Sequence, residues 1–368
     1  MQNSKVFFTD MRTTEGENLQ AKLIRLIRTA GIANIDFRNK FAAIKMHFGE
    51  PGNLAFLRPN YAKTVADMVR ELGGRPFLTD TNTLYVGGRK NALDHLESAY
   101  LNGFSPFSTG CHIIIADGLK GSDELMVPVP GGELLRQAKI GRAIMDADII
   151  ITLTHFKCHE LTGIGGVLKN IGMGSGSRAG KMEMHAAGKP SVSQDSCTGC
   201  GSCAKVCAHS AVRLVQGKAS IDPNACVGCG SCISACPVDA VEPEYDAALD
   251  DLNQKMAEYA AAVLAGKPHF HISLVVDVSP CCDCNDGNDI PIVPDIGMFA
   301  SFDPVALDAA CADAVNNQRP AAGSRLDNSE DKGGDHFSAV CPGTNWRVCI
   351  NHAVKLGLGT GGYELLTI

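Results

Sequence analysis

The chain has 368 residues, of which 45% are hydrophobic, which is enough for two or more compact units with their own cores. Its net charge of −7 argues against nucleic acid or an anionic membrane surface as a partner. No apolar run reaches the ~18 residues of a membrane span, and the first residues show no apolar signal core. With 16 cysteines and no export signal, we expect a cytoplasmic protein in a reducing compartment.

Strands and helices alternate along the first half of the chain. Thr14 and Glu17 have the spacing of a capping box ahead of the first helix, and Gly73 is a typical stop after the second. The apolar periodicity predicts strands at 5–9, 41–47, 75–79, 112–116 and 148–154, and helices at 19–30, 60–72 and 91–102. This rhythm predicts an α/β fold with a mostly parallel sheet and helices on both faces.

Eight cysteines follow in two matching runs with the spacing C-x-x-C-x-x-C-x-x-x-C, which is typical of bacterial ferredoxins that hold two [4Fe–4S] clusters. In that pattern the fourth cysteine of each run binds the other cluster. We therefore assign Cys197, Cys200, Cys203 and Cys236 to one cluster, and Cys226, Cys229, Cys232 and Cys207 to the other. Zinc sites or disulfides are the alternatives, but neither explains the three-plus-one symmetry. Clusters of this kind suggest an anaerobic host.

The α/β pattern resumes after the cysteine runs. It predicts helices at 245–265, 303–315 and 346–356 and strands at 272–278 and 295–300, with Asp303 as a helix N-cap. We therefore divide the chain into a first α/β part (1–187), an inserted ferredoxin-like domain of α+β type (188–243) and a second α/β part (244–368).

Several long stretches outside the cysteine runs carry a family resemblance. They are IKMHFGEPGNLAFLRP (Ile44–Pro59), HFKCHELTGIGGVLKNIGMG (His155–Gly174), SRAGKMEMH (Ser177–His185), CCDCNDGNDIPIVPDIGMFASFDPVALD (Cys281–Asp308) and DHFSAVCPGTNWRVCINHAVKLGLG (Asp335–Gly359). Together they resemble the iron–sulfur proteins of the domain-of-unknown-function family numbered 362, over almost the whole chain. The resemblance implies an α/β domain with an embedded ferredoxin module, and it implies no particular reaction. Cys281 departs from the usual C-x-C pair.

Polar side chains gather where predicted strands end, which is where open α/β sheets bind ligands. His155, Lys157 and His159 alternate along one extended segment, so their side chains can share a cleft. Histidine can move protons, and lysine can hold a carboxylate or phosphate. We predict His155, Lys157, His159 and Lys45 as catalytic residues and His47, Arg58, Lys169 and Asn170 as substrate-binding residues. Ordinary turn chemistry and surface ion pairs are the competing interpretation.

The run Cys281, Cys282 and Cys284 also follows a predicted strand. Thiols placed this closely are candidates for an additional metal or cluster, or for a redox pair. Inert, buried thiols in a loop are the alternative.

The leading hypothesis is an iron–sulfur oxidoreductase of the reductase type, which passes electrons through two [4Fe–4S] clusters to a small-molecule substrate in the α/β domain. Its partner would be an electron donor or acceptor protein, such as a ferredoxin or reductase, and a homodimer is the commonest assembly. One alternative is a ferredoxin-like carrier or adaptor that docks a partner enzyme. Another is a non-redox racemase or isomerase, by fold analogy with nickel-dependent lactate racemases.

Overall fold

A central sheet of eight strands organises the computed structural model, which describes residues 3–85, 87–185, 189–226, 228, 230–243, 249–329 and 334–368. Its strands are β1 (Ser4–Asp10), β2 (Phe41–Lys45), β3 (Arg75–Asp80), β4 (Ile113–Ile115), β7 (Ile149–His155), β14 (His269–Val275), β15 (Gly297–Ser301) and β16 (Tyr363–Thr367). They lie in the order β16-β1-β15-β14-β7-β2-β3-β4. Because β15 alone in this described sheet runs against its neighbours, the sheet is mostly parallel, as predicted.

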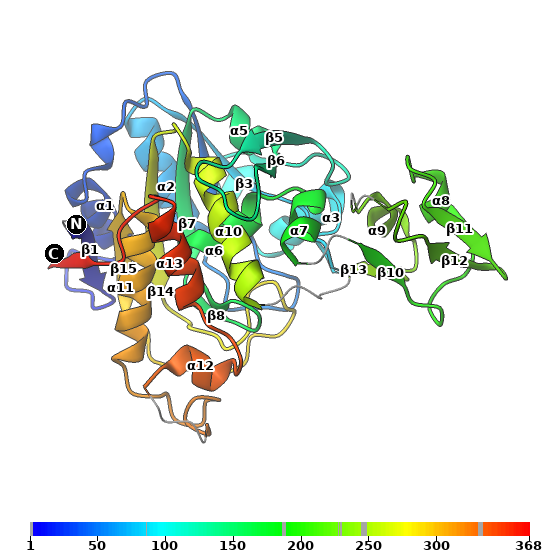
Figure 1. The fold of residues 1–368 in the computed structure, drawn as a ribbon. Coiled ribbons are helices and arrows are strands. Elements are labelled where there is room, and N and C mark those ends of the chain that lie inside the picture. The colour runs from blue at the N-terminus through cyan, green and yellow to red at the C-terminus, as the bar shows by residue number, and fades with distance from the viewer. Residues whose placement is uncertain are drawn as a thin grey trace.

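Helices cover both faces of this sheet (Figure 1). One face packs on α1 (Leu19–Thr29), α2 (Pro59–Glu71) and α3 (Ala92–Leu101); the other packs on α6 (Val167–Ser175), α10 (Leu249–Leu264), α11 (Pro304–Asn316) and α13 (Arg347–Lys355). Side chains alternate along a strand, so Ile149 and Ile151 of β7 enter the first core and Ile150 enters the second. A strand buried on both faces explains why β7 begins as an unbroken apolar run.

Shorter elements complete the α/β part. They are the 3₁₀ turn η1 (Ile32–Asn34), the helices α4 (Pro106–Thr109), α5 (Arg142–Asp146), α7 (Arg178–His185) and α12 (His336–Val340), and two antiparallel pairs, β5 (Glu124–Pro128) with β6 (Gln137–Gly141) and β8 (Lys157–His159) with β9 (Gly163–Gly165). No helix in the described ranges has both the length and the apolar composition to cross a bilayer.

The segment with the cysteine runs lies to one side of the sheet, next to α3 and α7 (Figure 1). It contains β10 (Pro190–Val192), α8 (Ser202–Lys205), β11 (Val212–Val215), β12 (Lys218–Ile221), α9 (Ser231–Ala235) and β13 (Val241–Pro243). β10 pairs with β13, which brings the two ends of the segment together, and β11 pairs with β12. This closure is what an insertion into another domain requires, and we keep 188–243 as the proposed limits of the insert.

Several predicted element boundaries differ from the structure by one to three residues, and the cap of the first helix and the start of β14 show why. The first helix is capped by Asn18, whose side chain accepts the Ala21 N–H at 2.9 Å, whereas Thr14 and Glu17 pair with each other in the preceding turn. Strand β14 occupies 269–275 rather than 272–278, because its backbone pairs with β7 from His269 and with β15 from His271. Helix α10 begins at 249 in the structure, and residues 245–248 of the predicted helix lie outside the described residues.

Buried polar groups fasten the helices of the second face to their neighbours. The carboxylate of Glu258, which is 0% exposed in α10, accepts the N–H groups of Glu133, Leu134 and Leu135 at 2.7, 2.9 and 2.7 Å. It also lies 3.1 Å from Nε2 of His352 on α13. One side chain therefore provides the acceptor that three buried N–H groups of a loop need, and it also links α10 to α13.

We predict that Glu258→Ala lowers the free energy of unfolding by about 3 kcal/mol, because three buried N–H groups lose their acceptor. Urea unfolding followed by circular dichroism measures this loss. The exposed Glu97→Ala is the control and should change stability by less than about 0.5 kcal/mol. Equal stability of the two variants would contradict the assigned role of Glu258.

Candidate active site

A cavity of about 490 Å³ lies at the carboxyl ends of the parallel strands β2, β3 and β7. This is the edge at which open α/β sheets bind ligands. The loop after β14 contributes to the wall on one side, and α6 and α7 contribute on others. The predicted site residues that line the cavity are Lys45, His47, His155, Lys157, His159, Lys169, Asn170, Cys282 and Cys284.

Two predicted residues are not part of the cavity wall. Arg58 is exposed at the N-cap position of α2, so the structure gives it no contact with a ligand in this cavity. Cys281 is half-buried and does not line the cavity, unlike its neighbour Cys282.

Sequence reasoning missed several lining residues with basic side chains, namely Arg89, Lys181 and His185. Lys181 and His185 are four residues apart on α7, a spacing that places both on one face of a helix. Arg89 lies in the loop between β3 and α3, so its position after a strand end was a usable signal. The burial of His185 lowers its pKa to about 3, so its ring is neutral.

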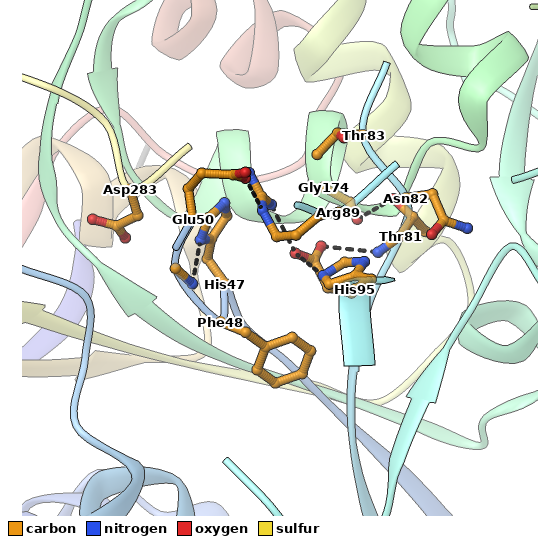
Figure 2. Close-up of polar contacts among 12 residues, drawn as sticks. His47, Phe48, Glu50, Thr81, Asn82, Thr83, Arg89, His95, Gly174 and Asp283 are labelled. Carbon is orange, nitrogen blue, oxygen red and sulfur yellow. Dashed lines mark hydrogen bonds and ion pairs between the residues drawn. The ribbon is translucent and has the colours of Figure 1, made fainter. Parts of the chain in front are cut away.

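Three of the cations at the cavity have carboxylate partners. Lys45 pairs with Asp80 at 2.8 Å, Arg89 with Glu50 at 2.7 Å, and Lys157 with Asp283 at 3.0 Å. Such pairing is what burial of a charge requires. Figure 2 shows Glu50 and Arg89 facing each other beside His47 and His95.

Lys169 and Lys181 have no carboxylate within ion-pair distance among the described residues. The ammonium of Lys169 lies 3.4 Å from the sulfur of Cys282. Lys181 donates to the hydroxyl of Thr81 and, at 2.7 Å, to the carbonyl of Gly176. Burial lowers the pKa of Lys181 to about 8, so it is mostly cationic at neutral pH. The cavity therefore has spare positive charge for an anion.

Asp80 is the centre of a buried charge network at the end of β3. In addition to Lys45, its carboxylate lies 3.9 Å from Arg89 and 3.8 Å from Nε2 of His95. Burial acts to raise the pKa of Asp80, but Lys45 and the other neighbouring cations outweigh it and hold that pKa well below its usual range. Burial lowers the pKa of His95 to about 3, so Asp80 is balanced by Lys45 and Arg89.

His155 is held on both sides by acceptors. Its Nδ1 lies 2.8 Å from Asp283, and its Nε2 lies 2.8 Å from the carbonyl of Val276. Asp283 also binds Lys157, whose ammonium donates to the carbonyl of His155 at 2.9 Å. With both ring nitrogens engaged, His155 is suited to positioning Asp283 and Lys157 rather than to exchanging a proton with a ligand.

His47 and His159 have a different environment. Nδ1 of His47 accepts the Gly49 N–H at 2.9 Å, and Nδ1 of His159 accepts the Leu161 and Thr162 N–H groups at 3.2 Å each. Burial lowers the pKa of both histidines well below the usual range, so both rings are neutral. A neutral ring whose Nδ1 is an acceptor carries its proton on Nε2. Both histidines can therefore offer Nε2–H to a ligand.

The loop after β14 places two thiols at the cavity. The sulfurs of Cys282 and Cys284 and a ring nitrogen of His159 lie within 4.8 Å of one another, a grouping that is compatible with a soft metal ion. The tautomer of His159 disfavours a metal, because a ligating imidazole needs a lone pair on the nitrogen that faces the ion. The positive charge of Lys169 against Cys282 disfavours a second cation at the same sulfur.

The N-terminus of α6 does not present an open anion site. The carboxylate of Asp308 accepts the N–H groups of Val167 and Leu168 at 2.6 and 2.9 Å. Asn170 on the next turn accepts from Lys45 at 2.9 Å and donates to Thr154 at 2.9 Å. Asn170 therefore orients Lys45, and the anion at this helix end belongs to the protein.

The structure brings together four of the predicted cluster cysteines. Cys197, Cys200, Cys203 and Cys236 line one small hollow, although Cys236 comes from the second run. Cys207, Cys226 and Cys232 are also described, whereas Cys229 lies outside the described residues. Backbone N–H groups reach three sulfurs: Ala219 to Cys197 at 3.3 Å, Ala211 to Cys207 at 3.3 Å and Ala240 to Cys236 at 3.2 Å.

Two segments connect the cavity with the cysteine segment. Leu84 lies in the loop after β3, lines the cavity and packs in one apolar cluster with Cys203 and Cys232. Met182 belongs to the same cluster, and its neighbour Lys181 on α7 lines the cavity. The loop and α7 thus form a wall that the two sites share.

The sequence matches a family described as Domain of unknown function (DUF362) over residues 42–313. The chain belongs to the DUF362 family. No curated protein matches the sequence of this DUF362 protein.

Two solved structures are similar to this DUF362 protein at low scores. One is the lactate racemase apoprotein from Thermoanaerobacterium thermosaccharolyticum, with 9% identity over 73% of this chain and 50% of that chain and a TM-score of 0.36. The other is a protein from Thermotoga maritima, with 12% identity over 83% of this chain and 60% of that chain and a TM-score of 0.39. The DUF362 chain thus spans half to three fifths of their lengths.

We predict that the cavity of this DUF362 protein binds a small dicarboxylate such as succinate, and that binding weakens as the pH rises through about 8, the pKa of Lys181. Below that pH Lys181 is a cation and above it is neutral, so the affinity should fall by at most about tenfold per pH unit. Calorimetric titrations on both sides of this pH measure the effect.

Lys181→Met should weaken succinate binding near neutral pH and flatten its pH dependence. The matched control is Lys120→Met, which removes an exposed lysine. The same pH dependence in Lys181→Met as in the wild type would contradict the assignment.

Proposed function

We propose that this DUF362 protein is an iron–sulfur oxidoreductase that passes electrons through two [4Fe–4S] clusters to a small anionic molecule in the α/β cavity. The observation that carries the proposal is the shared wall: the loop with Leu84 and helix α7 line the cavity and pack against the cysteine segment. A bare electron carrier has no need of a large charged cavity against its cluster segment.

The cysteines of this segment are suitable ligands for two [4Fe–4S] clusters. The spacing of both runs is that of a two-cluster ferredoxin, and Cys236 lies beside Cys197, Cys200 and Cys203 as the crossed arrangement requires. The three N–H groups that point to sulfurs are of the kind that adjust cluster potentials. Bound clusters would supply one-electron transfer.

The cavity supports an anionic substrate with hydrogen-bond donors beside it. Lys169 and Lys181 lack carboxylate partners in the described structure, so they are the residues proposed to bind the anion. The Nε2–H groups of His47 and His159 are proposed to donate hydrogen bonds to the substrate as it gains negative charge. Asp283 holds Lys157 and His155 in place around them.

A partner protein that delivers or removes electrons is part of the proposal. The cysteine segment exposes several apolar side chains, namely Val206, Leu214, Val215 and Val238, and Val238 lies beside the exposed Cys200. Such a surface suits transient docking of a redox protein. The same surface would serve the alternative function, in which the chain is an electron-carrying adaptor for a partner enzyme.

Anaerobically purified protein is predicted to contain about eight irons and eight sulfides per chain. Cys200→Ala and Cys236→Ala should each retain about four irons, and the double variant should also retain about four, because both residues belong to one cluster. The control pair Cys200→Ala with Cys226→Ala should lose nearly all iron. If the double variant at 200 and 236 loses both clusters, the crossed assignment is wrong.

The redox function is tested by reducing the clusters with dithionite under argon and adding a panel of small carboxylates and phosphates. We expect at least one anion to reoxidise the clusters, seen as recovery of visible absorbance, and Lys169→Gln to slow this recovery without loss of iron. Reoxidation by protein partners alone would favour the adaptor. Conversion of an anion while the clusters stay oxidised would favour the racemase-like alternative.

A further inference from the structure

Cys282 and Cys284 form a pair of thiols inside the cavity. Both residues line it, and their sulfurs lie within 4.8 Å of each other. The turn that holds them is fixed by the Asn285 N–H to the carbonyl of Cys282 at 2.9 Å and by the Glu50 N–H to the carbonyl of Asp283 at 2.8 Å. The two sulfurs are therefore held close together by backbone contacts on both sides.

The two thiols are not equivalent. Cys282 is 1% exposed and its sulfur lies 3.4 Å from the ammonium of Lys169, whereas Cys284 is half-buried. A hydrogen bond from Cys284, together with Lys169, holds the pKa of Cys282 well below its usual range, and the same hydrogen bond raises the pKa of Cys284. A thiolate next to a protonated thiol is the arrangement found in reactive dithiols.

A metal ion explains these contacts less well. The set of two cysteines and one histidine is a known zinc donor set. Here Nδ1 of His159 is occupied by two backbone N–H groups, which leaves the proton on Nε2, and Lys169 already neutralises Cys282. The same two contacts suit a redox pair, because the lysine stabilises the thiolate of the reduced form.

We propose that Cys282 and Cys284 are a reversible dithiol–disulfide pair that exchanges two electrons with the ligand in the cavity. Oxidation joins the two sulfurs, removes two electrons and releases the proton of Cys284. Reduction breaks the S–S bond, takes up two electrons, one from each of two reduced [4Fe–4S] clusters, and returns the proton. The source of electrons rests on the proposed function, whereas formation of the disulfide does not.

The test uses the full-length protein, equilibrated anaerobically in glutathione buffers of graded ratio. Acid quenching, labelling of free thiols with N-ethylmaleimide under denaturing conditions, and peptide mass spectrometry then count the labels at each cysteine. We expect the peptide with Cys282 and Cys284 to lose both labels together as the buffer becomes oxidising, while Cys111 and Cys311, which are buried elsewhere, keep theirs. Retention of both labels at the most oxidising ratio would overturn the proposal.

Lys169→Gln separates a redox pair from two neighbouring thiols that oxidise nonspecifically. Because Lys169 stabilises the reduced form, its loss should shift the glutathione ratio at half-oxidation by about tenfold towards reducing conditions. The control Lys120→Gln changes an exposed lysine and should leave the ratio unchanged. Stoichiometric zinc or iron that protects this peptide from labelling until a chelator removes it would also overturn the proposal, in favour of a metal site.

A second measurement tests the route of the electrons. Stepwise dithionite should reopen the disulfide in the wild type and fail to do so at the same rate in Cys200→Ala with Cys226→Ala, which is designed to lack both clusters. Equal rates would overturn the cluster-coupled reduction and leave the disulfide itself standing. Intact clusters with no disulfide would overturn this inference and leave the proposed function standing.

Discussion

The cost of burying charge is the constraint on which this structure depends. Lys45, Arg89 and Lys157 lie under the carboxyl ends of the strands, and each is paired with a carboxylate that is itself buried. Asp80 and Asp283 come from different strand ends, so the charge pairs also link separate parts of the sheet. Removing either carboxylate would leave a buried cation without compensation.

Against this background, Lys169 and Lys181 stand out as cations without carboxylates in the described structure. Lys169 has a sulfur as its neighbour and Lys181 has a hydroxyl and a carbonyl, which stabilise an ammonium less than a carboxylate does. A buried cation needs a compensating negative charge, as the paired lysines show. The same requirement points to a thiolate at Cys282 and to an anionic ligand. The Cys282 thiolate accounts for Lys169, and the charge of Lys181 is the one that remains for an anionic ligand.

The topology explains why the cavity and the cysteine segment are neighbours. In a parallel sheet the loops after successive strands leave from one edge, so the loop after β3 and the segment after β7 meet there. The cysteine segment follows α7 directly in the chain, and α7 lies at this edge. Cys203 and Cys232 of this segment therefore pack against the cavity wall without any long connection.

The sequence by itself determined the features that depend on local order. Period-two and period-3.6 apolar patterns identified most strands and helices, and the cysteine spacing indicated the crossed grouping of Cys236 with the first run. His155, Lys157 and His159 were recognised as sharing a cleft because they alternate along one segment. The cap of the first helix was misassigned because Thr14 and Asn18 both offer a suitable side chain, and only the fold selects between them.

Only the tertiary structure decided which distant residues meet and which partners they take. Arg89, Lys181 and His185 reach the cavity from segments far apart in the chain, and Arg58 turns away from it. Asp283 contacts both His155 and Lys157, so Nδ1 of His155 faces a carboxylate of the protein. The physical reason is that the charge and protonation of a side chain depend on its burial and on its neighbours in space. The order of residues along the chain does not specify those neighbours.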